Sequence, residues 1–357
     1  YIGDLMSKST AEFPIWNIEK ARAGKKSGWD YIDGCMIMAL LEIYSTSGDK
    51  KYLDFCDYYE DYRIRDDGTI DGYDKNTWNC DELNGGKNLF VLYRYTNKEK
   101  YKKALDLLYE QVKGQPRTPE GNFWHKQIYP NQVWLDGLYM AQPFYMEYEK
   151  LFNNSKNIED IYNQFFNVYK IMRDPKTGLY YHCYDSSKKM FWADKETGLS
   201  KNFWLRSLGW FSMALLDTLN IAPDRGSENW NKLKDIFIDL CESMLKFQDE
   251  SGMWWQVPNY PGKGKNYLET SGSAIFAYSL LKGYRTKILE DKKFQEAGIK
   301  AFEGICDKYL NTESGRLSLG GICLVAGLGP EKDLRRDGTF DYYMSEPIVQ
   351  DDAKGVG

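Results

Sequence analysis

Side chains that could move protons or bind an anion recur at one position of a repeated sequence pattern. In each copy, a polar or aromatic cluster is followed by a glycine and then by a long apolar stretch. The glycines are Gly34, Gly86, Gly137, Gly209 and Gly272. The charged residues just before them are Asp30, Asp33, Asp81, Glu82, Asp136, Arg206 and Glu269. If each apolar stretch is a helix, these side chains lie at helix N-termini and face one end of the molecule, where carboxylates can perform acid–base chemistry.

An acidic residue at a helix N-terminus also has an ordinary explanation, because it complements the helix dipole by a few tenths to about 1 kcal/mol. That explanation accounts for Glu269 on its own. It does not account for Arg206, whose charge has the wrong sign for a helix N-terminus. The helix dipole also does not explain the aromatic residues around these positions, which are Trp134, Tyr139, Trp204 and Trp210. Charge and aromatic content together favour a functional site centred on Asp136.

The chain has two histidines, and both follow a turn glycine by four residues. His125 comes after Gly121, and His182 comes after Gly178. Because the two positions are equivalent in the repeat, we expect both loops to deliver their histidine to the same rim as Asp136. Histidine changes its charge near neutral pH and suits such a site. No histidine pair or histidine–cysteine set has the spacing of metal ligands, so we expect no metal.

Two kinds of helix-sized segment alternate along the chain. One kind is almost wholly apolar and contains the glycines of the repeat. The other kind has apolar residues on a single face and occupies 50–62, 97–113, 158–172, 229–247 and 291–309. A helix that is apolar all round must be surrounded by protein, whereas an amphipathic helix belongs on the outside. Each repeat is therefore expected to be an inner helix followed by an outer one.

The five glycines are 52, 51, 72 and 63 residues apart, and the last sequence block, near Gly320, supplies a sixth unit. Turns with a central glycine separate the units at 67–70, 120–123, 177–180, 251–254 and 314–317. Six helical hairpins closing in a ring predict an all-α fold, an (α/α)6 barrel, as one domain over residues 1–357. The pattern lacks the strand–helix alternation of a TIM barrel. An open helical solenoid would also suit repeated hairpins, but six units with atypical ends fit a closed ring better.

Composition narrows the possible partners. Of the 357 residues, 16% are aromatic, with 28 Tyr and 11 Trp, and these two types suit clefts that bind sugars because one end can stay wet. The net charge of −5, without a run of Lys or Arg, argues against nucleic acid and anionic membranes as partners. No stretch approaches the ~20 apolar residues of a membrane span. The Gly-x-Gly runs at 262–264 and 327–329 follow no strand, so they do not predict a dinucleotide-binding site. We expect the protein to need no cofactor.

Seven cysteines without a Cys-x-x-Cys motif indicate free thiols in a reducing compartment, so we expect a cytoplasmic protein. The chain opens at Tyr1 without Met, which leaves open a removed leader and a periplasmic location. The oligomeric state is not indicated by the sequence.

Several motifs resemble glycoside hydrolase family 105, the unsaturated rhamnogalacturonyl hydrolases. The most specific is 125–140 (HKQIYPNQVWLDGLYM). Others are Asp81-Glu82, the loop around His182, 204–210 (WLRSLGW), 325–329 (VAGLG), 336–340 (RDGTF) and 342–347 (YYMSEP). The resemblance spans nearly the whole chain. It extends to enzymes that are similar to unsaturated glucuronyl hydrolases.

The resemblance implies an (α/α)6 barrel and a role in polysaccharide degradation. The substrate it favours is an oligosaccharide derived from pectin. Such enzymes release a 4,5-unsaturated uronic acid from the non-reducing end of oligosaccharides made by polysaccharide lyases, by hydrating an enol ether. Position by position, it implies Asp136 as the general acid and then base, assisted by Asp81. The residues implied to hold the sugar are His125, Lys126, Trp134, Tyr139, Met140, His182, Trp204, Arg206 and Trp210.

Elementary chemistry agrees with this assignment. Protonating a vinyl carbon needs a carboxylic acid that still carries its proton near neutral pH, and an aromatic enclosure suits that role. The substrate carboxylate would find a charged partner in Arg206 or Lys126. The pair Asp81 and Asp136 could also serve a conventional inverting glycosidase. The same residues are compatible with a polysaccharide lyase, a sugar epimerase or a non-catalytic glycan-binding protein.

Overall fold

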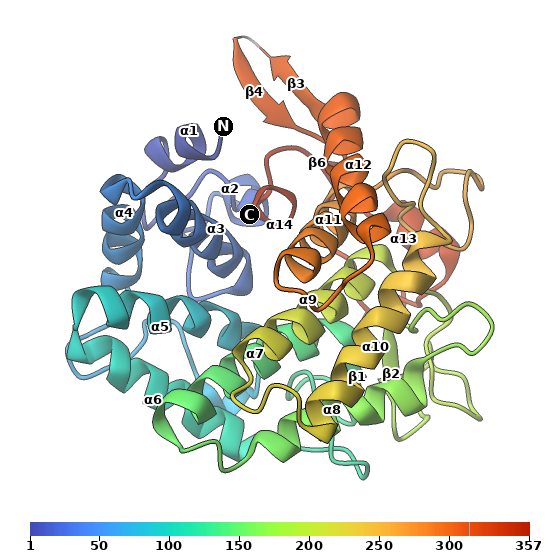
Figure 1. Ribbon diagram of the computed structural model, residues 1–357, viewed down its shortest axis with the longest axis horizontal. Helices are drawn as coiled ribbons and strands as arrows, with labels where there is room; N and C mark the ends of the chain where they lie inside the picture. The colour runs from blue at the N-terminus through green and yellow to red at the C-terminus, as the bar shows by residue number, and fades with distance from the viewer. Residues whose placement is uncertain (314) are drawn as a thin grey trace.

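The computed structural model describes residues 1–313 and 315–357, and its long helices form two concentric layers around a ring (Figure 1). The inner layer consists of α3 (Tyr31–Ser47), α5 (Leu83–Thr96), α7 (Leu135–Phe152), α9 (Leu205–Ile221) and α11 (Thr270–Arg285). The outer layer consists of α4 (Lys50–Asp61), α6 (Glu99–Gly114), α8 (Ile158–Met172), α10 (Glu228–Leu245) and α12 (Lys292–Tyr309). Each outer helix follows an inner helix in the chain and packs against it. This arrangement confirms the predicted helical hairpins.

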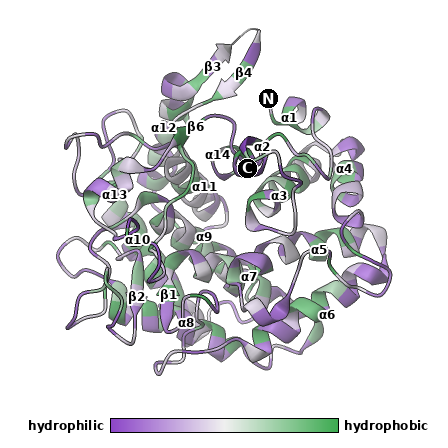
Figure 2. Ribbon diagram, turned by 180° about the vertical axis from the view of Figure 1, so that it is seen from behind, coloured by the Kyte–Doolittle hydropathy of each residue, from purple (hydrophilic) through white to green (hydrophobic). Residues whose placement is uncertain are grey.

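Burial explains why the two kinds of segment separate into layers. The inner helix α9 is buried over most of its length, including polar residues such as Ser207 and Thr218. The outer helix α6 buries one face, through Tyr101, Leu105 and Leu108 among others, and exposes the opposite face. Figure 2 shows hydrophilic residues mainly around the periphery, on the outer helices and loops. The 3.6-residue period of the apolar residues therefore determined the layer of each helix.

The repeated glycines lie on the inner helices, as predicted, because neighbouring helices approach closely there. An added Cβ at Gly272 would lie 2.4 Å from Leu205 Cγ on the adjacent helix α9. At Gly137, it would lie 2.9 Å from His125 Nδ1. The first contact is a packing requirement. The second leaves room for a histidine loop beside the N-terminus of α7.

The sixth unit differs from the prediction. The chain around Gly320 forms short strands instead of a helical hairpin: β3 (Leu310–Glu313), β4 (Arg316–Leu319) and β5 (Ile322–Cys323), the last paired with β6 (Ile348–Val349). The apolar run after Gly320 is too short for a helix because Gly327, Gly329 and Pro330 interrupt it. The helix α14 (Ala353–Val356) contacts both α3 and α11 and closes the ring at the sixth inner position. The (α/α)6 arrangement holds, but its sixth unit came from a later segment.

The remaining elements are short and lie at the ends of the barrel. They are α1 (Ile2–Ser7), α2 (Ile18–Arg22), α13 (Phe340–Ser345), the 3-10 turns η1 (Lys75–Thr77) and η2 (Cys80–Glu82), and the antiparallel pair β1 (Gln132–Trp134) and β2 (Cys183–Asp185). The predicted turn glycines all have a positive φ, between 76° and 99°, which favours glycine. They are Gly68, Gly121, Gly178, Gly252 and Gly315. In the last of these turns, Ser314 lies outside the described residues. None of the described helices has both the length and the apolar character needed to cross a membrane.

Candidate active site

The two-stranded sheet of β1 and β2 brings two candidate residues, Asp136 and His182, close together. β1 leads directly into α7, and β2 starts directly after His182. The strands pair with Trp134 opposite Cys183. The N–H of Leu135 donates a hydrogen bond of 3.2 Å to the carbonyl oxygen of His182. His182 therefore lies beside the first turn of α7, which carries Asp136.

The side chains of Asp136 and His182 face each other. Asp136 Oδ2 lies 3.2 Å from His182 Nε2, and neither buried atom has a hydrogen-bond partner of suitable geometry. The other ring nitrogen, Nδ1, lies 2.8 Å from the hydroxyl oxygen of Tyr343. The Asp136 side chain is 13% exposed, whereas that of His182 is fully buried. Asp136 is thus largely shielded from bulk water, and its buried Oδ2 lies against the imidazole of His182.

A second carboxylate, Asp81, is held in its ionised form. Lys126 Nζ lies 2.6 Å from Asp81 Oδ2, and His125 Nε2 lies 3.5 Å from Asp81 Oδ1. Burial alone would raise the pKa of Asp81, but the charge of Lys126 and its hydrogen bond to the carboxylate outweigh burial, and the pKa is lowered. Burial lowers the pKa of His125 to about 4, against the opposing charge of Asp81, so the imidazole is neutral near pH 7. The site therefore combines a fixed anion with a neutral histidine.

Replacing Lys126 with methionine should move the acid limb of the pH–activity profile to higher pH. Asp81 acts as an anion above its pKa and loses that charge as the pH falls through it. Without the ammonium group, burial dominates and the pKa of Asp81 rises. The measurement is kcat as a function of pH, with the exposed Lys176→Met variant as the control. An acid limb at the same pH in wild type and Lys126→Met would contradict an assisting role for ionised Asp81.

Aromatic rings form a wall around these groups. The Trp134 ring stacks on His125, with centroids 4.7 Å apart and an interplanar angle of 13°, and on Tyr129, with centroids 4.9 Å apart. The edge of Trp134 meets His182, with centroids 5.5 Å apart, and the centroid of Trp204 lies 4.8 Å from that of His182. Faces of this kind stack on the C–H faces of a sugar ring, while the polar tips bind its hydroxyls.

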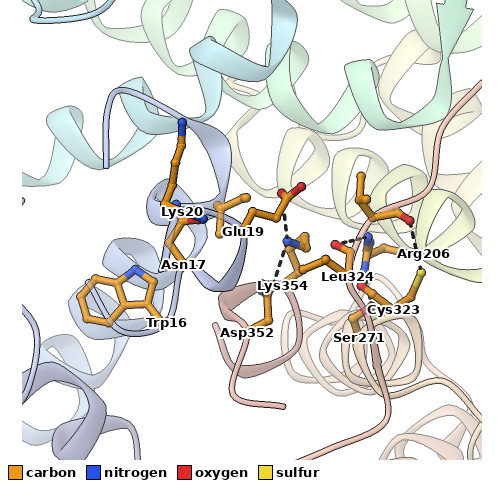
Figure 3. A network of polar contacts seen from close by, with 12 residues as sticks. Trp16, Asn17, Glu19, Lys20, Arg206, Ser271, Cys323, Leu324, Asp352 and Lys354 are labelled. Atoms are coloured by element: carbon orange, nitrogen blue, oxygen red, sulfur yellow. Dashed lines mark hydrogen bonds and ion pairs between the residues drawn. The ribbon is translucent and has the colours of Figure 1, made fainter. Parts of the chain in front are cut away.

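Arg206 occupies the N-terminus of α9 and is 1% exposed. Its Nη1 donates hydrogen bonds to Ser271 Oγ, at 3.1 Å, and to the carbonyl oxygen of Cys323, and Nη2 donates to the carbonyl oxygen of Leu324 at 3.4 Å (Figure 3). Its guanidinium carbon lies 4.7 Å from the centroid of the Trp204 ring. These partners are neutral, and no carboxylate of the described residues forms an ion pair with it. A buried cation of this kind is suited to receive an anion.

Three of the predicted binding residues lie apart from this cluster. Tyr139 and Trp210 stack on each other, with centroids 5.0 Å apart, and Lys87 Nζ lies 3.2 Å from the centroid of Tyr139. Both rings line a cavity of about 550 Å³ inside the ring, formed largely by the middle and C-terminal parts of the inner helices. Met140 is buried in the hydrophobic core, at 1% exposed. The roles of these three residues in binding stay predictions.

Two of the acidic residues before the repeat glycines have the ordinary role of helix caps. The Asp30 side chain accepts hydrogen bonds from the N–H groups of Ile32 and Asp33, and Glu269 accepts them from Ser271 and Gly272. Asp136 makes no such bond, because α7 lacks a side-chain cap. Within residues 1–313 and 315–357, no group of three or more His, Cys, Asp or Glu side chains is placed to hold a metal ion.

The sequence as a whole matches a known family of sugar-cleaving enzymes. The model of Glycosyl Hydrolase Family 88 covers residues 4–357. The chain belongs to Glycosyl Hydrolase Family 88. This family 88 protein is therefore an enzyme, a glycoside hydrolase, and a non-catalytic glycan-binding protein is excluded.

Solved and curated relatives agree with this membership. A solved glycoside hydrolase of family 105 from C. acetobutylicum is 41% identical, with a TM-score of 0.91, covering 99% of this chain and 95% of that one. This match confirms the resemblance to family 105 and the (α/α)6 fold. Protein Atu3128 of Agrobacterium fabrum is 40% identical over 222 residues, which are 61% of this chain and 94% of the relative. The unsaturated rhamnogalacturonyl hydrolase YesR of Bacillus subtilis is 25% identical over 259 residues, 71% of this chain and 70% of the relative.

The structure of the family 88 enzyme also adds residues to the site that sequence reasoning gave no role. Tyr343 orients His182 through Nδ1, and Tyr129 extends the aromatic stack on Trp134. Both belong to motifs that carried the resemblance, 342–347 and 125–140, so a signal was present. The motif could not show which of its tyrosines points into the site, since that depends on contacts between distant segments.

Proposed function

We propose that this glycoside hydrolase removes a 4,5-unsaturated uronic acid from the non-reducing end of lyase-generated oligosaccharides. The observation that carries the proposal is the carboxyl group of Asp136, which does not cap its helix and faces His182 within an aromatic wall and beside the ionised Asp81. One acid that can deliver a proton, next to one fixed anion, is what enol-ether hydration requires. The relative named unsaturated rhamnogalacturonyl hydrolase supports oligosaccharides of the rhamnogalacturonan type as the first substrates to try.

In the proposed reaction, Asp136 gives its proton to C4 of the unsaturated sugar. The C4=C5 double bond is consumed, and the positive charge that develops is shared between C5 and the ring oxygen. Water adds to C5 and returns a proton to the Asp136 carboxylate, so the acid is regenerated. The resulting hemiketal opens to a 5-keto group, and the hemiacetal left at C1 collapses and releases the rest of the oligosaccharide. The negative charge of Asp81 stabilises the developing positive charge.

Arg206 is the proposed partner of the substrate carboxylate. The pairing of the Lys126 ammonium group with Asp81 at 2.6 Å supports this choice over Lys126. The hydrogen bonds that Arg206 donates within the described residues instead go only to neutral oxygen atoms. A buried guanidinium binds a carboxylate with directional, charge-assisted hydrogen bonds.

The test is a screen of oligosaccharides produced by different polysaccharide lyases, each paired with its saturated counterpart. Hydration destroys the conjugated double bond, so ultraviolet absorbance should fall with unsaturated substrates, and the saturated counterparts should remain intact. The substrate class with the fastest loss identifies the glycan that follows the unsaturated sugar. Cleavage of a saturated oligosaccharide, without any loss of absorbance from unsaturated ones, would instead show a conventional glycosidase.

A further inference from the structure

A group of buried polar atoms beside Arg206 lacks ordinary hydrogen-bond partners. Among the described residues, it comprises the indole Nε1 of Trp204, both amide atoms of Gln256 and the phenol oxygen of Tyr267. Gln256 is 0% exposed. Buried polar groups in native proteins are nearly always paired, and each exception calls for an explanation. A bound molecule that supplies the missing partners is such an explanation, because leaving them unpaired is costly.

The backbone holds Gln256 next to the helix that carries Arg206. The carbonyl oxygen of Gln256 accepts a hydrogen bond of 3.0 Å from the N–H of Leu205, the first residue of α9. The N–H of Gln256 donates to the carbonyl oxygen of Tyr267 at 2.8 Å, so the two side chains belong to adjoining strands of one loop. The position of Gln256 is therefore set by main-chain bonds and not by its own amide group.

Cys323 connects these side chains to Arg206. Its carbonyl oxygen accepts a hydrogen bond from Arg206 Nη1, a contact drawn in Figure 3. Its thiol lies within reach of the Gln256 and Tyr267 side chains, but a thiol is a weak hydrogen-bond partner. The side chains of Arg206, Gln256 and Tyr267 thus surround Cys323. The Gln256 amide and the Tyr267 hydroxyl keep their main hydrogen-bonding capacity for another partner.

The chemistry of the group selects an anion. Arg206 is a buried cation, and the amide of Gln256 offers two N–H donors. Burial raises the pKa of Tyr267 well above its usual value, so the phenol keeps its proton and acts as a donor near neutral pH. Glu269, the acid that caps α11, already accepts hydrogen bonds from Ser271 and from the N–H of Cys323. Donors without acceptors around a cation match a carboxylate.

We propose that Gln256 and Tyr267 donate hydrogen bonds to the carboxylate of the unsaturated sugar and complete, with Arg206, a three-residue carboxylate receptor. This assignment rests on the proposed function and adds two residues that determine specificity for acidic over neutral sugars. The amide oxygen of Gln256 is left to accept a hydrogen bond from a sugar hydroxyl.

The experiment compares an unsaturated disaccharide with its methyl ester, using Gln256→Met and Tyr267→Phe. Gln256→Met keeps the length of the side chain, and Tyr267→Phe keeps the ring. Losing a hydrogen bond to a charged group should raise KM for the acid by roughly 10- to 100-fold. We expect kcat to change much less, because neither residue delivers the proton. KM for the ester should change little. Tyr169→Phe, which removes an exposed phenol on the outer helix α8, is the matched control and should behave as wild type.

The outcomes separate this proposal from the proposed function. A wild-type enzyme that leaves every unsaturated disaccharide unchanged would refute the function and the receptor together. If the wild type is active but both variants lose equally on acid and ester, or lose nothing, only the receptor is refuted. Because Gln256→Met could disturb the fold, its melting temperature is compared with that of wild type. Tyr267→Phe then decides the matter if the first variant fails to fold.

Discussion

Asp136→Asn is expected to lose almost all turnover while still binding the unsaturated substrate. Asparagine has nearly the size and hydrogen-bonding geometry of aspartate, and the Asp136 side chain faces His182 without acting as a helix cap. The fold should therefore tolerate the change. General acid–base help is worth about 10²–10⁴-fold, and removal of the one proposed proton donor should reach or exceed the top of that range. Single-turnover rates measure the loss, and calorimetric titration with the disaccharide measures binding.

Asp341→Asn, an exposed carboxylate on α13, is the control and should keep full activity. In heavy water, the wild-type enzyme should place deuterium on C4 of the released uronic product, because that carbon receives the proton. Displacement at the anomeric carbon would leave C4 without label and would put solvent oxygen on C1. A fully active Asn variant, or a product without deuterium at C4, would remove Asp136 from its proposed role.

Arg206→Ala is expected to cause the second-largest loss. Truncating one partner of a buried charge pair costs about 2–4 kcal/mol, which is roughly 30- to 1,000-fold in kcat/KM for the acidic substrate. The methyl ester of the same substrate should lose much less, because it carries no charge for the guanidinium to bind. The ratio of the two losses is the measurement.

The control for this variant must account for packing, since Arg206 also hydrogen-bonds Ser271 and contacts the Trp204 ring. Ser271→Ala removes one of these structural bonds and leaves the charge in place. It should lower the melting temperature without changing the acid-to-ester ratio. If Arg206→Ala reduces kcat/KM equally for acid and ester, Arg206 is not the carboxylate partner.

The layers of the barrel could be predicted because each helix carries its own pattern. The run Tyr101, Leu105, Leu108 has the period of one buried face, and the repeat glycines marked where inner helices touch. The sixth unit could not be predicted in the same way. Its inner helix, α14, has four residues, so it shows no period, and the segment near Gly320 pairs as strands through contacts with β3 and β6.

For the candidate site too, some features could be predicted from the sequence and others depended on the tertiary structure. The sequence by itself determined that Asp136 and Arg206 occupy one position of the repeat, just before an inner-helix glycine, and that the two histidines occupy another, four residues after a turn glycine. Residue order fixes such positions. Tertiary structure alone decided that Lys126 forms an ion pair with Asp81, and that Tyr139 and Trp210 stack inside the ring. It also decided that Gln256 reaches Arg206 through Cys323. These contacts join segments far apart in the chain, and no local pattern specifies a distance between side chains that only the closed ring brings together.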